Sequence, residues 1–257
     1  MRILVIGDII GNSGVNKIKE IVPNFKKEKN IDFIIANAEN SADGMGITVK
    51  IFEDLKKSNI DVMTMGNHTW GKREIFSIID EPQIIRPANY SEGIPGKGYM
   101  IYECNGKKIA VINLIGRVDI AVLSENPFLK AKKIVEKIKD EVDIIIVDFH
   151  AEATAEKIAM GYFLDGKVSC VYGTHTHVQT ADEKILENGT AYITDVGMTG
   201  PIHSVIGMDV EASLKRFVTT LPERYKVSSD KNVMMNGIIL NINDETCRME
   251  KIERIKL

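Results

Sequence analysis

The sequence has few cysteines and no long apolar segment. Its three cysteines, Cys104, Cys170 and Cys247, are an odd number without a CxxC spacing, which fits neither a disulfide framework nor a thiolate zinc site. No stretch approaches the roughly 20 apolar residues of a membrane span, and Asp8 comes too early for a signal peptide. We therefore expect a cytoplasmic protein that does not contact a membrane.

An excess of positive charge is also missing. The formal net charge is −3 and the pI is near 6.0, so the chain lacks the cationic field that drives binding to a nucleic-acid backbone. This argues against long duplex nucleic acid as a partner. There is no internal repeat, low-complexity tract or proline-rich linker at which to divide the chain. With 257 residues, 44% of them hydrophobic, we expect a single domain spanning residues 1–257.

What the chain does have is an alternation of short apolar runs and longer amphipathic stretches. The apolar runs are rich in isoleucine and valine, which is typical of strands buried on both faces. They lie at 3–6, 33–36, 62–65, 109–114, 144–149, 168–172 and 191–194. Stretches with apolar residues at helical spacing lie at 15–29, 49–58, 73–79, 127–141 and 153–164. The pattern predicts an α/β fold.

Two regions depart from this alternation. Residues 93–114 predict a hairpin that turns at Asn105 and Gly106, and the alternation ends after Gly197. We expect antiparallel strands in both regions, which would make the sheets mixed. Met234 and Met235 are expected to belong to the core or, in a homo-oligomer, to an interface.

Polar side chains follow five of the predicted strands. In chain order they are Asp8, then Glu39 and Asn40, then Asn67 and His68, then His150, and finally His175, Thr176 and His177. Because ligands bind beyond the carboxyl ends of strands in an open α/β sheet, we expect these side chains to converge. Imidazole nitrogens together with carboxylate and amide oxygens suit a pair of first-row metal ions, which a carboxylate such as Glu39 can bridge.

Each of these signals is weak by itself. An aspartate after a strand is usually a helix cap or turn residue, and Gly66-Asn67-His68 alone fits a turn. The pair His175 and His177 is a stronger signal, since positions i and i+2 beyond a strand place two imidazoles on one side. Together with the other strand ends, the pair favours a metal site over coincidence.

The motifs resemble those of the calcineurin-like metallophosphoesterases, a GNH block at 66–68 and a GHxH block that here reads GTHTH at 173–177. Nearly the whole chain resembles their bacterial YmdB-like branch, the 2′,3′-cyclic-nucleotide phosphodiesterases. The matching segments are GDIIG at 7–11, NAENSADGMG at 37–46, GNHTW at 66–70, DFHAEAT at 148–154 and GTHTHVQTAD at 173–182. This chain departs from the wider superfamily at two positions, with Ile10 in place of a histidine and Glu39 in place of the bridging aspartate. The YmdB-like branch shares both departures. The resemblance implies a four-layer sandwich of mixed sheets flanked by helices.

The resemblance also implies the roles of the site residues. The first metal ion would be held by Asp8, Glu39, Asn40 and His177, and the second by Glu39, Asn67, His150 and His175. Iron or manganese are the expected ions. We expect a metal-bound hydroxide to attack a small phosphodiester such as a cyclic nucleotide. His68 would then protonate the leaving ribose oxygen, which suits an imidazole with an unperturbed pKa of about 6.5.

Two alternative functions stay open at this point. A two-metal centre does not by itself select diesters, so a phosphomonoesterase or nuclease of the same superfamily is the first alternative. The second is a regulatory protein that has kept the fold and its metals but acts by binding a partner.

Residues near the motifs carry further expectations. Trp70 either stacks on a base or is a core aromatic. Residues 195–201 are expected to form a loop, at the phosphate pocket or as a plain turn. Asp148 shares a strand face with His150 and could orient it.

The remaining polar residues are given ordinary structural roles. Glu152 and Glu156 are expected only to offset the macrodipole of the helix that follows. His203 is expected to be a surface or core histidine.

Overall fold

The computed structural model describes residues 1–224 and 226–257, whose strands form two sheets. The first sheet runs in the order β2 (Asp8–Ile9), β12 (Met198–Pro201), β13 (Val233–Ile242), β1 (Arg2–Ile6), β3 (Phe33–Asn37), β4 (Val62–Thr64) and β5 (Ile84–Ile85), with β14 (Met249–Lys256) also paired to β13. The second runs β10 (Lys184–Ile185), β11 (Ala191–Ile193), β9 (Cys170–Thr174), β8 (Ile144–His150), β7 (Lys107–Ile115) and β6 (Tyr99–Cys104). The helices are α1 (Gly11–Glu28), α2 (Val49–Lys57), α3 (Pro127–Ile138), α4 (Thr154–Leu164), α5 (Val210–Thr219) and the 3-10 helix η1 (Arg73–Ser77).

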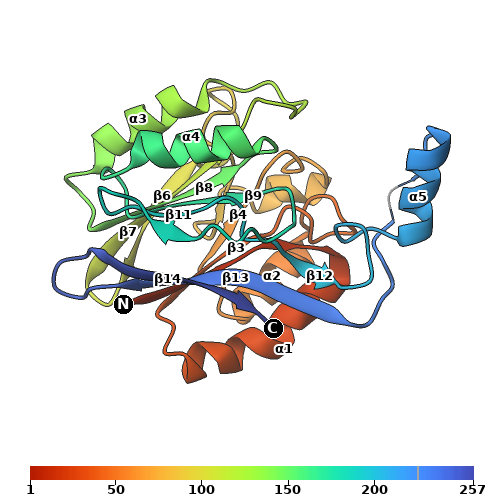
Figure 1. Ribbon diagram of the computed structural model, residues 1–257, viewed down its shortest axis with the longest axis horizontal. Helices are drawn as coiled ribbons and strands as arrows, with labels where there is room; N and C mark the ends of the chain where they lie inside the picture. Colours follow the sequence, from red (N-terminus) through yellow and green to blue (C-terminus); the bar gives the residue numbers. More distant parts are fainter. Residues whose placement is uncertain (225) are drawn as a thin grey trace.

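The two sheets stack on each other, and helices cover their outer faces. Figure 1 shows α1 and α2 on the first sheet and α3 and α4 on the second, while α5 projects away from the body. Both sheets contain parallel and antiparallel pairs, for example β1 with β3 and β1 with β13 in the first. The order helix, sheet, sheet, helix confirms the predicted four-layer α/β sandwich.

Alternating residues of each central strand serve two different cores. In β1, Ile3 and Val5 pack between the sheets together with Ile146 of β8. Leu4 of β1 packs under α1 and α2, and Val147 of β8 packs under α3 and α4. Because both faces of such a strand are buried, every position is apolar, which explains the uninterrupted apolar runs in the sequence.

The predicted hairpin is confirmed, with β6 and β7 antiparallel and Cys104 opposite Lys107. Asn105 and Gly106 have φ angles of 51° and 73°, the left-handed pair that a two-residue turn between twisted strands requires. The antiparallel strands expected after Gly197 are β13 and β14.

Two predicted segments differ in the structure. Residues 73–79 were expected to be an α-helix, but Arg73–Ser77 form a 3-10 helix, because helical spacing over so few residues does not separate the two. The expected loop at 195–201 is wrong for its second half, since β12 pairs with β2 and β13. Pro201 is tolerated there because it is the last residue of β12 and because β2 pairs only with Met198 and Thr199.

Other expectations concern burial. Met235 is fully buried, as expected of a core residue, and His203 lies on the surface. All three cysteines are free, and Cys170 is buried. Within residues 1–224 and 226–257, no helix combines the length and the apolarity that crossing a bilayer requires.

Packing between the two sheets is expected to dominate stability. Ile146 is fully buried between them, so Ile146→Ala should lower the free energy of unfolding by about 3 kcal/mol through lost burial and a residual cavity. Urea unfolding measures this. The control is Val118→Ala, at a side chain that is 48% exposed, for which about 0.5 kcal/mol or less is expected. Equal effects of the two substitutions would contradict the prediction.

Candidate metal centre

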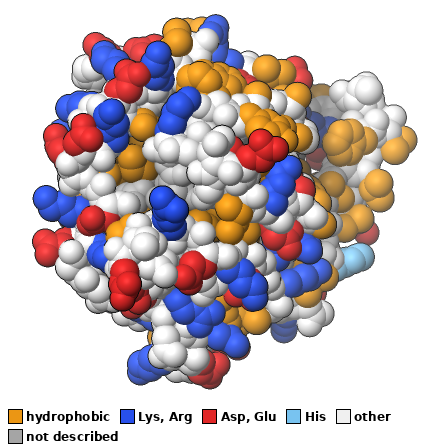
Figure 2. Space-filling model, turned by 60° about the vertical axis from the view of Figure 1, so that its left-hand side comes forward, with side chains coloured by type: hydrophobic (Ala, Val, Ile, Leu, Met, Phe, Trp, Pro, Cys, Tyr) orange, Lys and Arg blue, Asp and Glu red, His pale blue; other side chains and the backbone are white. Residues whose placement is uncertain are grey.

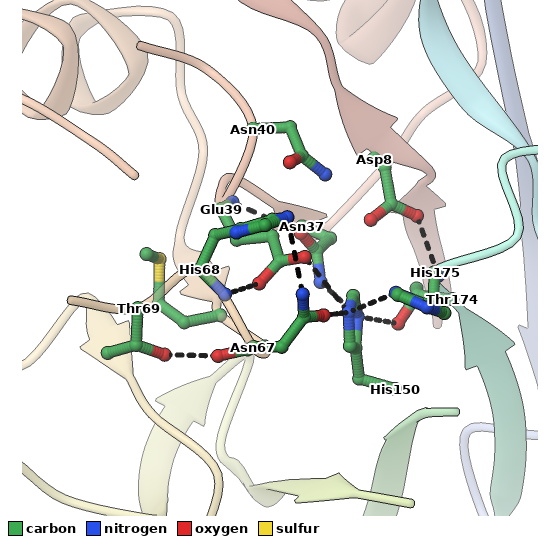
Figure 3. Close-up of polar contacts among 12 residues, drawn as sticks. Asp8, Asn37, Glu39, Asn40, Asn67, His68, Thr69, His150, Thr174 and His175 are labelled. Carbon is green, nitrogen blue, oxygen red and sulfur yellow. Dashed lines mark hydrogen bonds and ion pairs between the residues drawn. The ribbon is translucent and has the colours of Figure 1, made fainter. Parts of the chain in front are cut away.

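The predicted site residues lie together at one edge of the two sheets. Asp8 begins β2, Glu39 and Asn40 follow β3, Asn67 and His68 follow β4, His150 ends β8, and His175 and His177 follow β9. Figure 3 shows that the labelled members of this set surround one small space. The first sheet contributes the carboxylates and amides, and the second contributes three of the histidines.

The tightest group surrounds Nε2 of His150. Oε1 of Glu39 and Oδ1 of Asn67 each lie 2.9 Å from this nitrogen, and Nδ1 of His175 lies 3.0 Å from it. One nitrogen has at most one proton to donate, so it cannot satisfy three acceptors. Donor atoms bound at about 2.1 Å to one first-row ion lie about 3 Å apart, so these four atoms have the spacing of metal ligands.

A second group surrounds His177. Its Nε2 lies 3.2 Å from Nδ2 of Asn40 and 3.7 Å from Oδ1 of Asp8. The two groups are connected, because the other carboxylate oxygen of Asp8 accepts a hydrogen bond from the backbone N–H of His175 at 3.2 Å.

The outward-facing nitrogens of all three histidines have hydrogen-bond acceptors. Nδ1 of His150 lies 2.9 Å from the Thr174 hydroxyl, which donates its own proton to Asp148 at 2.7 Å. Nε2 of His175 lies 3.1 Å from the Glu152 carboxylate, and Nδ1 of His177 lies 2.8 Å from the carbonyl oxygen of Ile206. When the rings are neutral, these partners take the ring protons on the outside and direct the opposite lone pairs into the site.

Two buried carboxylate oxygens lack a well-aligned donor. Within the described part of the chain, Oδ1 of Asp8 and Oε1 of Glu39 have no hydrogen-bond partner of good geometry, although both carboxylates are fully buried. Leaving a carboxylate oxygen buried without a partner is costly. Glu39, His150 and His175 also offer ligand atoms that all lie within 4.8 Å of one another. The donor set, the inward lone pairs and the two oxygens together fit bound cations.

His68 lies beside this space. Its backbone N–H donates to Oε2 of Glu39 at 2.8 Å, and its Nε2 lies 3.2 Å from the amide nitrogen of Asn67. The ring is half-buried, so it borders the site and is also open to a substrate. Gly66, which precedes this turn, has no room for a side chain, because a Cβ there would lie 2.4 Å from the His150 ring. Close approach of the backbone explains the glycine of the GNH block.

Burial and charge separate the pKa values of the site residues. Burial alone would raise the pKa of Glu39, but the adjacent His150 lowers it to about 2. Burial likewise opposes protonation of His150, yet Glu39 and Asp8 raise its pKa to about 9. Burial and the neighbouring His150 charge lower the pKa of His175 to about 3. Without metal, His150 therefore carries a proton at neutral pH while His175 is neutral.

The sequence predicted a role at the site for Asp148 but none for Glu152. Asp148 was expected to orient His150, and it does reach that ring, through the Thr174 hydroxyl. Burial raises the pKa of Asp148 to about 6. Glu152 was given no role beyond the helix macrodipole, which is wrong, because its contact with His175 brings it to the site. Glu156 instead accepts the backbone N–H of Arg117 at 3.1 Å.

The segment that carries His175 and His177 is held in an unusual backbone conformation. The two histidines have φ angles of 96° and 64°, a region that costs side-chain-bearing residues about 1–3 kcal/mol each. Between them, the backbone N–H and hydroxyl of Thr176 donate to Asp195 at 3.2 and 2.6 Å. Asp195 is in turn paired with the buried Lys157 at 2.7 Å. The sequence reasoning missed this anchor, although Asp195 follows a strand just as Asp8 does.

An aromatic cluster lies next to the His68 turn. Trp70 stacks on Phe76 with ring centroids 5.4 Å apart, and the Tyr90 ring centroid lies 6.3 Å from that of Trp70. The Tyr90 hydroxyl donates to the carbonyl oxygen of Gly66 at 2.8 Å. Trp70 is 36% exposed and Phe76 is 57% exposed, so Trp70 is only partly a core residue, and its stacking on a base stays a prediction.

The two stacked sheets covered by helices define a fold class, the four-layer sandwich of the metallophosphoesterase type. A solved structure of the NAD nucleotidase of Haemophilus influenzae matches it with a TM-score of 0.62 at 14% identity, covering 100% of this chain and 56% of that one. At this identity the likeness concerns the fold alone.

Within this class, the chain belongs to the family of YmdB-like proteins, whose sequence model matches residues 4–255. The 2′,3′-cyclic-nucleotide 2′-phosphodiesterase of Bacillus subtilis strain 168 is 51% identical over 256 residues, which are 99% of this chain and 96% of that protein. A solved structure described as a novel phosphatase from Mycoplasma pneumoniae is 37% identical with a TM-score of 0.94, covering 100% of this chain and 93% of that one. The family predicted from the motifs is confirmed.

Uptake of metal should release protons. Coordination needs a deprotonated imidazole, and the pKa of His150 is raised to about 9 in the metal-free protein, so binding at pH 7.5 should expel about one proton from this residue. Apparent affinity should therefore fall by up to about tenfold per pH unit below that pKa. Calorimetric titration with Mn²⁺ in buffers of different ionisation enthalpy measures the release. Identical heats in all buffers would contradict the prediction.

Proposed function

We propose that this chain is a metal-dependent phosphodiesterase that hydrolyses 2′,3′-cyclic nucleotides or closely related small phosphodiesters. The observation that carries the proposal is the convergence of three inward-directed imidazoles with two buried carboxylates, each of which has one oxygen without a hydrogen-bond partner. The name of the Bacillus subtilis relative, 51% identical over nearly its full length, supports the choice of substrate.

Two ions are proposed, one for each group of side chains. Nε2 of His177 with Asp8 and Asn40 would hold the first, and His150, His175 and Asn67 would hold the second. Glu39 is the residue proposed to serve both. Iron or manganese suits this mixture of imidazole, carboxylate and amide donors. When bound, such ions supply a water of lowered pKa and offset negative charge on phosphoryl oxygens.

His68 is proposed as the proton donor to the leaving ribose oxygen. Its backbone is fixed by Glu39 and its ring by the Asn67 amide, so the imidazole stays at the border of the site. Its half-buried ring is accessible to a bound substrate. The exposed edges of Trp70 and Phe76, two and eight positions further along the chain, would contact the base.

Replacing His68 with alanine should separate catalysis from metal binding. We expect kcat to fall by about 10²–10⁴-fold, the usual contribution of a general acid, with metal content near that of the wild type. The matched variant Glu39→Gln should lose bound metal as well as activity, because it removes the proposed shared carboxylate. Elemental analysis and steady-state kinetics measure the two effects. Loss of metal in His68→Ala would show that this residue is a ligand and not the acid.

A substrate panel tests the reaction class. On one metal-loaded preparation, we expect a 2′,3′-cyclic nucleotide to be hydrolysed with a higher kcat/KM than a linear dinucleotide or a nucleoside monophosphate. Because the Mycoplasma pneumoniae relative is described as a phosphatase, the monoester is the informative competitor. A preference for the monoester would replace the phosphodiesterase proposal by a phosphomonoesterase. A full complement of metal without turnover of any of the three would favour a regulatory protein.

A further inference from the structure

A cavity of about 340 Å³ lies between helix α3 and the segment that joins β5 to β6. One side is formed by four residues on a single face of α3, at the spacing i, i+3, i+4 and i+7: Lys130, Lys133, Ile134 and Lys137. Residues between 86 and 99 form the other side. It is called the α3 cavity here. None of the predicted metal ligands lines it, and neither does His68, so it is separate from the metal centre.

The α3 cavity is strongly basic. Five of its lining residues are cationic and one is acidic: Arg86, Lys97, Lys130, Lys133 and Lys137, with Glu92 as the acid. The whole chain, by contrast, has a net charge of −3, and Figure 2 shows basic and acidic side chains interspersed over the face that it draws. Charges of one sign that line a concave surface focus the electrostatic potential. The cavity should therefore attract anions.

The acidic residues nearby do not neutralise this charge. Glu92 lies 3.6 Å from the Lys130 ammonium and 3.9 Å from that of Lys133, but its side chain is 74% exposed, and ion pairs so exposed to water contribute little. Glu125 lies 2.9 Å from the same Lys130 nitrogen. The other three cations of the cavity have no ion-pair partner among residues 1–224 and 226–257.

Arg86 shows most clearly that an anion is missing. The residue is only 8% exposed, and its guanidinium donates to three neutral backbone carbonyls, those of Pro87 at 2.8 Å, Pro95 at 2.9 Å and Ile94 at 3.3 Å. A guanidinium has five N–H donors, so two of them lack a partner within the described chain. Burying a charged group without a counter-ion is costly. An anion in the cavity would offset that cost.

Phosphate is the anion that suits these donors best. A phosphate monoester carries about −1.5 to −2 charges at pH 7 and has three acceptor oxygens, so it can contact several cations at once, whereas a carboxylate carries a single charge. The planar fork of Arg86 matches phosphate geometry, and the lysines add point charges. The volume is at the small end of ligand sites, about 300–1,000 Å³, which leaves room for more than the phosphate. Tyr90 and Tyr99, which also line the cavity, offer ring surfaces to a sugar or base.

We propose that the α3 cavity binds the phosphate group of a nucleotide unit. Two sources share this chemistry: a free nucleotide, and the neighbouring nucleotide of an oligonucleotide whose cyclic end occupies the metal centre. The second source rests on the proposed function. It is within reach because Tyr90 lines the cavity and its hydroxyl donates to the carbonyl oxygen of Gly66 at 2.8 Å, directly before Asn67 and His68. The cavity therefore adjoins the turn that carries the proposed acid.

Calorimetric titration of the metal-loaded protein with adenosine 5′-monophosphate tests the site. The variant Lys97→Ala/Lys137→Ala removes two exposed cations of the cavity and leaves the carbonyl contacts of Arg86 intact. Its dissociation constant should rise at least about tenfold, equivalent to about 1.4 kcal/mol. The matched control Lys108→Ala/Lys132→Ala removes the same charge from exposed positions outside the cavity and should bind like the wild type. Binding at the metal centre is common to the three proteins and cancels in the comparison.

Steady-state kinetics distinguishes the two sources. A dinucleotide that ends in a 2′,3′-cyclic phosphate is compared with the cyclic mononucleotide. A higher kcat/KM for the dinucleotide, lost in the cavity variant and kept in the control, identifies the neighbouring nucleotide as the source. Equal values for the two substrates, with nucleotide binding still lost in the cavity variant, identify a free nucleotide.

A cavity variant that matches the control in both assays would overturn the proposal. So would equal binding of phosphate-free adenosine and adenosine 5′-monophosphate at the cavity, because the phosphate would then contribute nothing. Absence of turnover with either cyclic substrate would count against the proposed function instead, while the calorimetric comparison still decides whether the cavity binds phosphate.

Discussion

The contact between Glu39 and His150 is the interaction on which the rest of the site depends. Glu39 follows a strand of the first sheet, His150 ends a strand of the second, and their side chains meet at 2.9 Å with both residues fully buried. Bringing a carboxylate and an imidazole out of water is costly unless they are paired with each other or with a cation. The packing of the two sheets holds this pair, so the apolar core between the sheets also determines the geometry of the site.

Hydrogen bonds from outside the centre determine how each histidine is oriented. Thr174, Glu152 and the carbonyl of Ile206 occupy the outer nitrogens of His150, His175 and His177, respectively. Such partners select the tautomer and fix the ring plane before any ion arrives. The ring planes are therefore fixed in advance, so an ion that displaced the proton of His150 would cost little side-chain entropy on binding.

The surroundings of the centre suit a small, partly apolar substrate. The stacked pair Trp70 and Phe76 offers a flat surface beside the His68 turn, while the half-exposed Glu152 carboxylate stands at the other side of the centre near His175. A negative charge at the rim repels a dianionic monoester more strongly than a monoanionic diester. Both features agree with a nucleoside phosphodiester as the substrate.

The sequence by itself determined the α/β alternation, the hairpin at Asn105-Gly106 and the set of polar residues at the strand ends, because periodicity and turn chemistry are local properties. Tertiary structure alone decided that Pro201 ends a strand, that Glu152 reaches His175, and that Asp195 anchors Thr176. These contacts join residues far apart in the chain or depend on the partner that a strand or side chain finds in space. Local spacing carries no record of such partners, so the polar residues that converge at the site were predictable while the residues that position them were not.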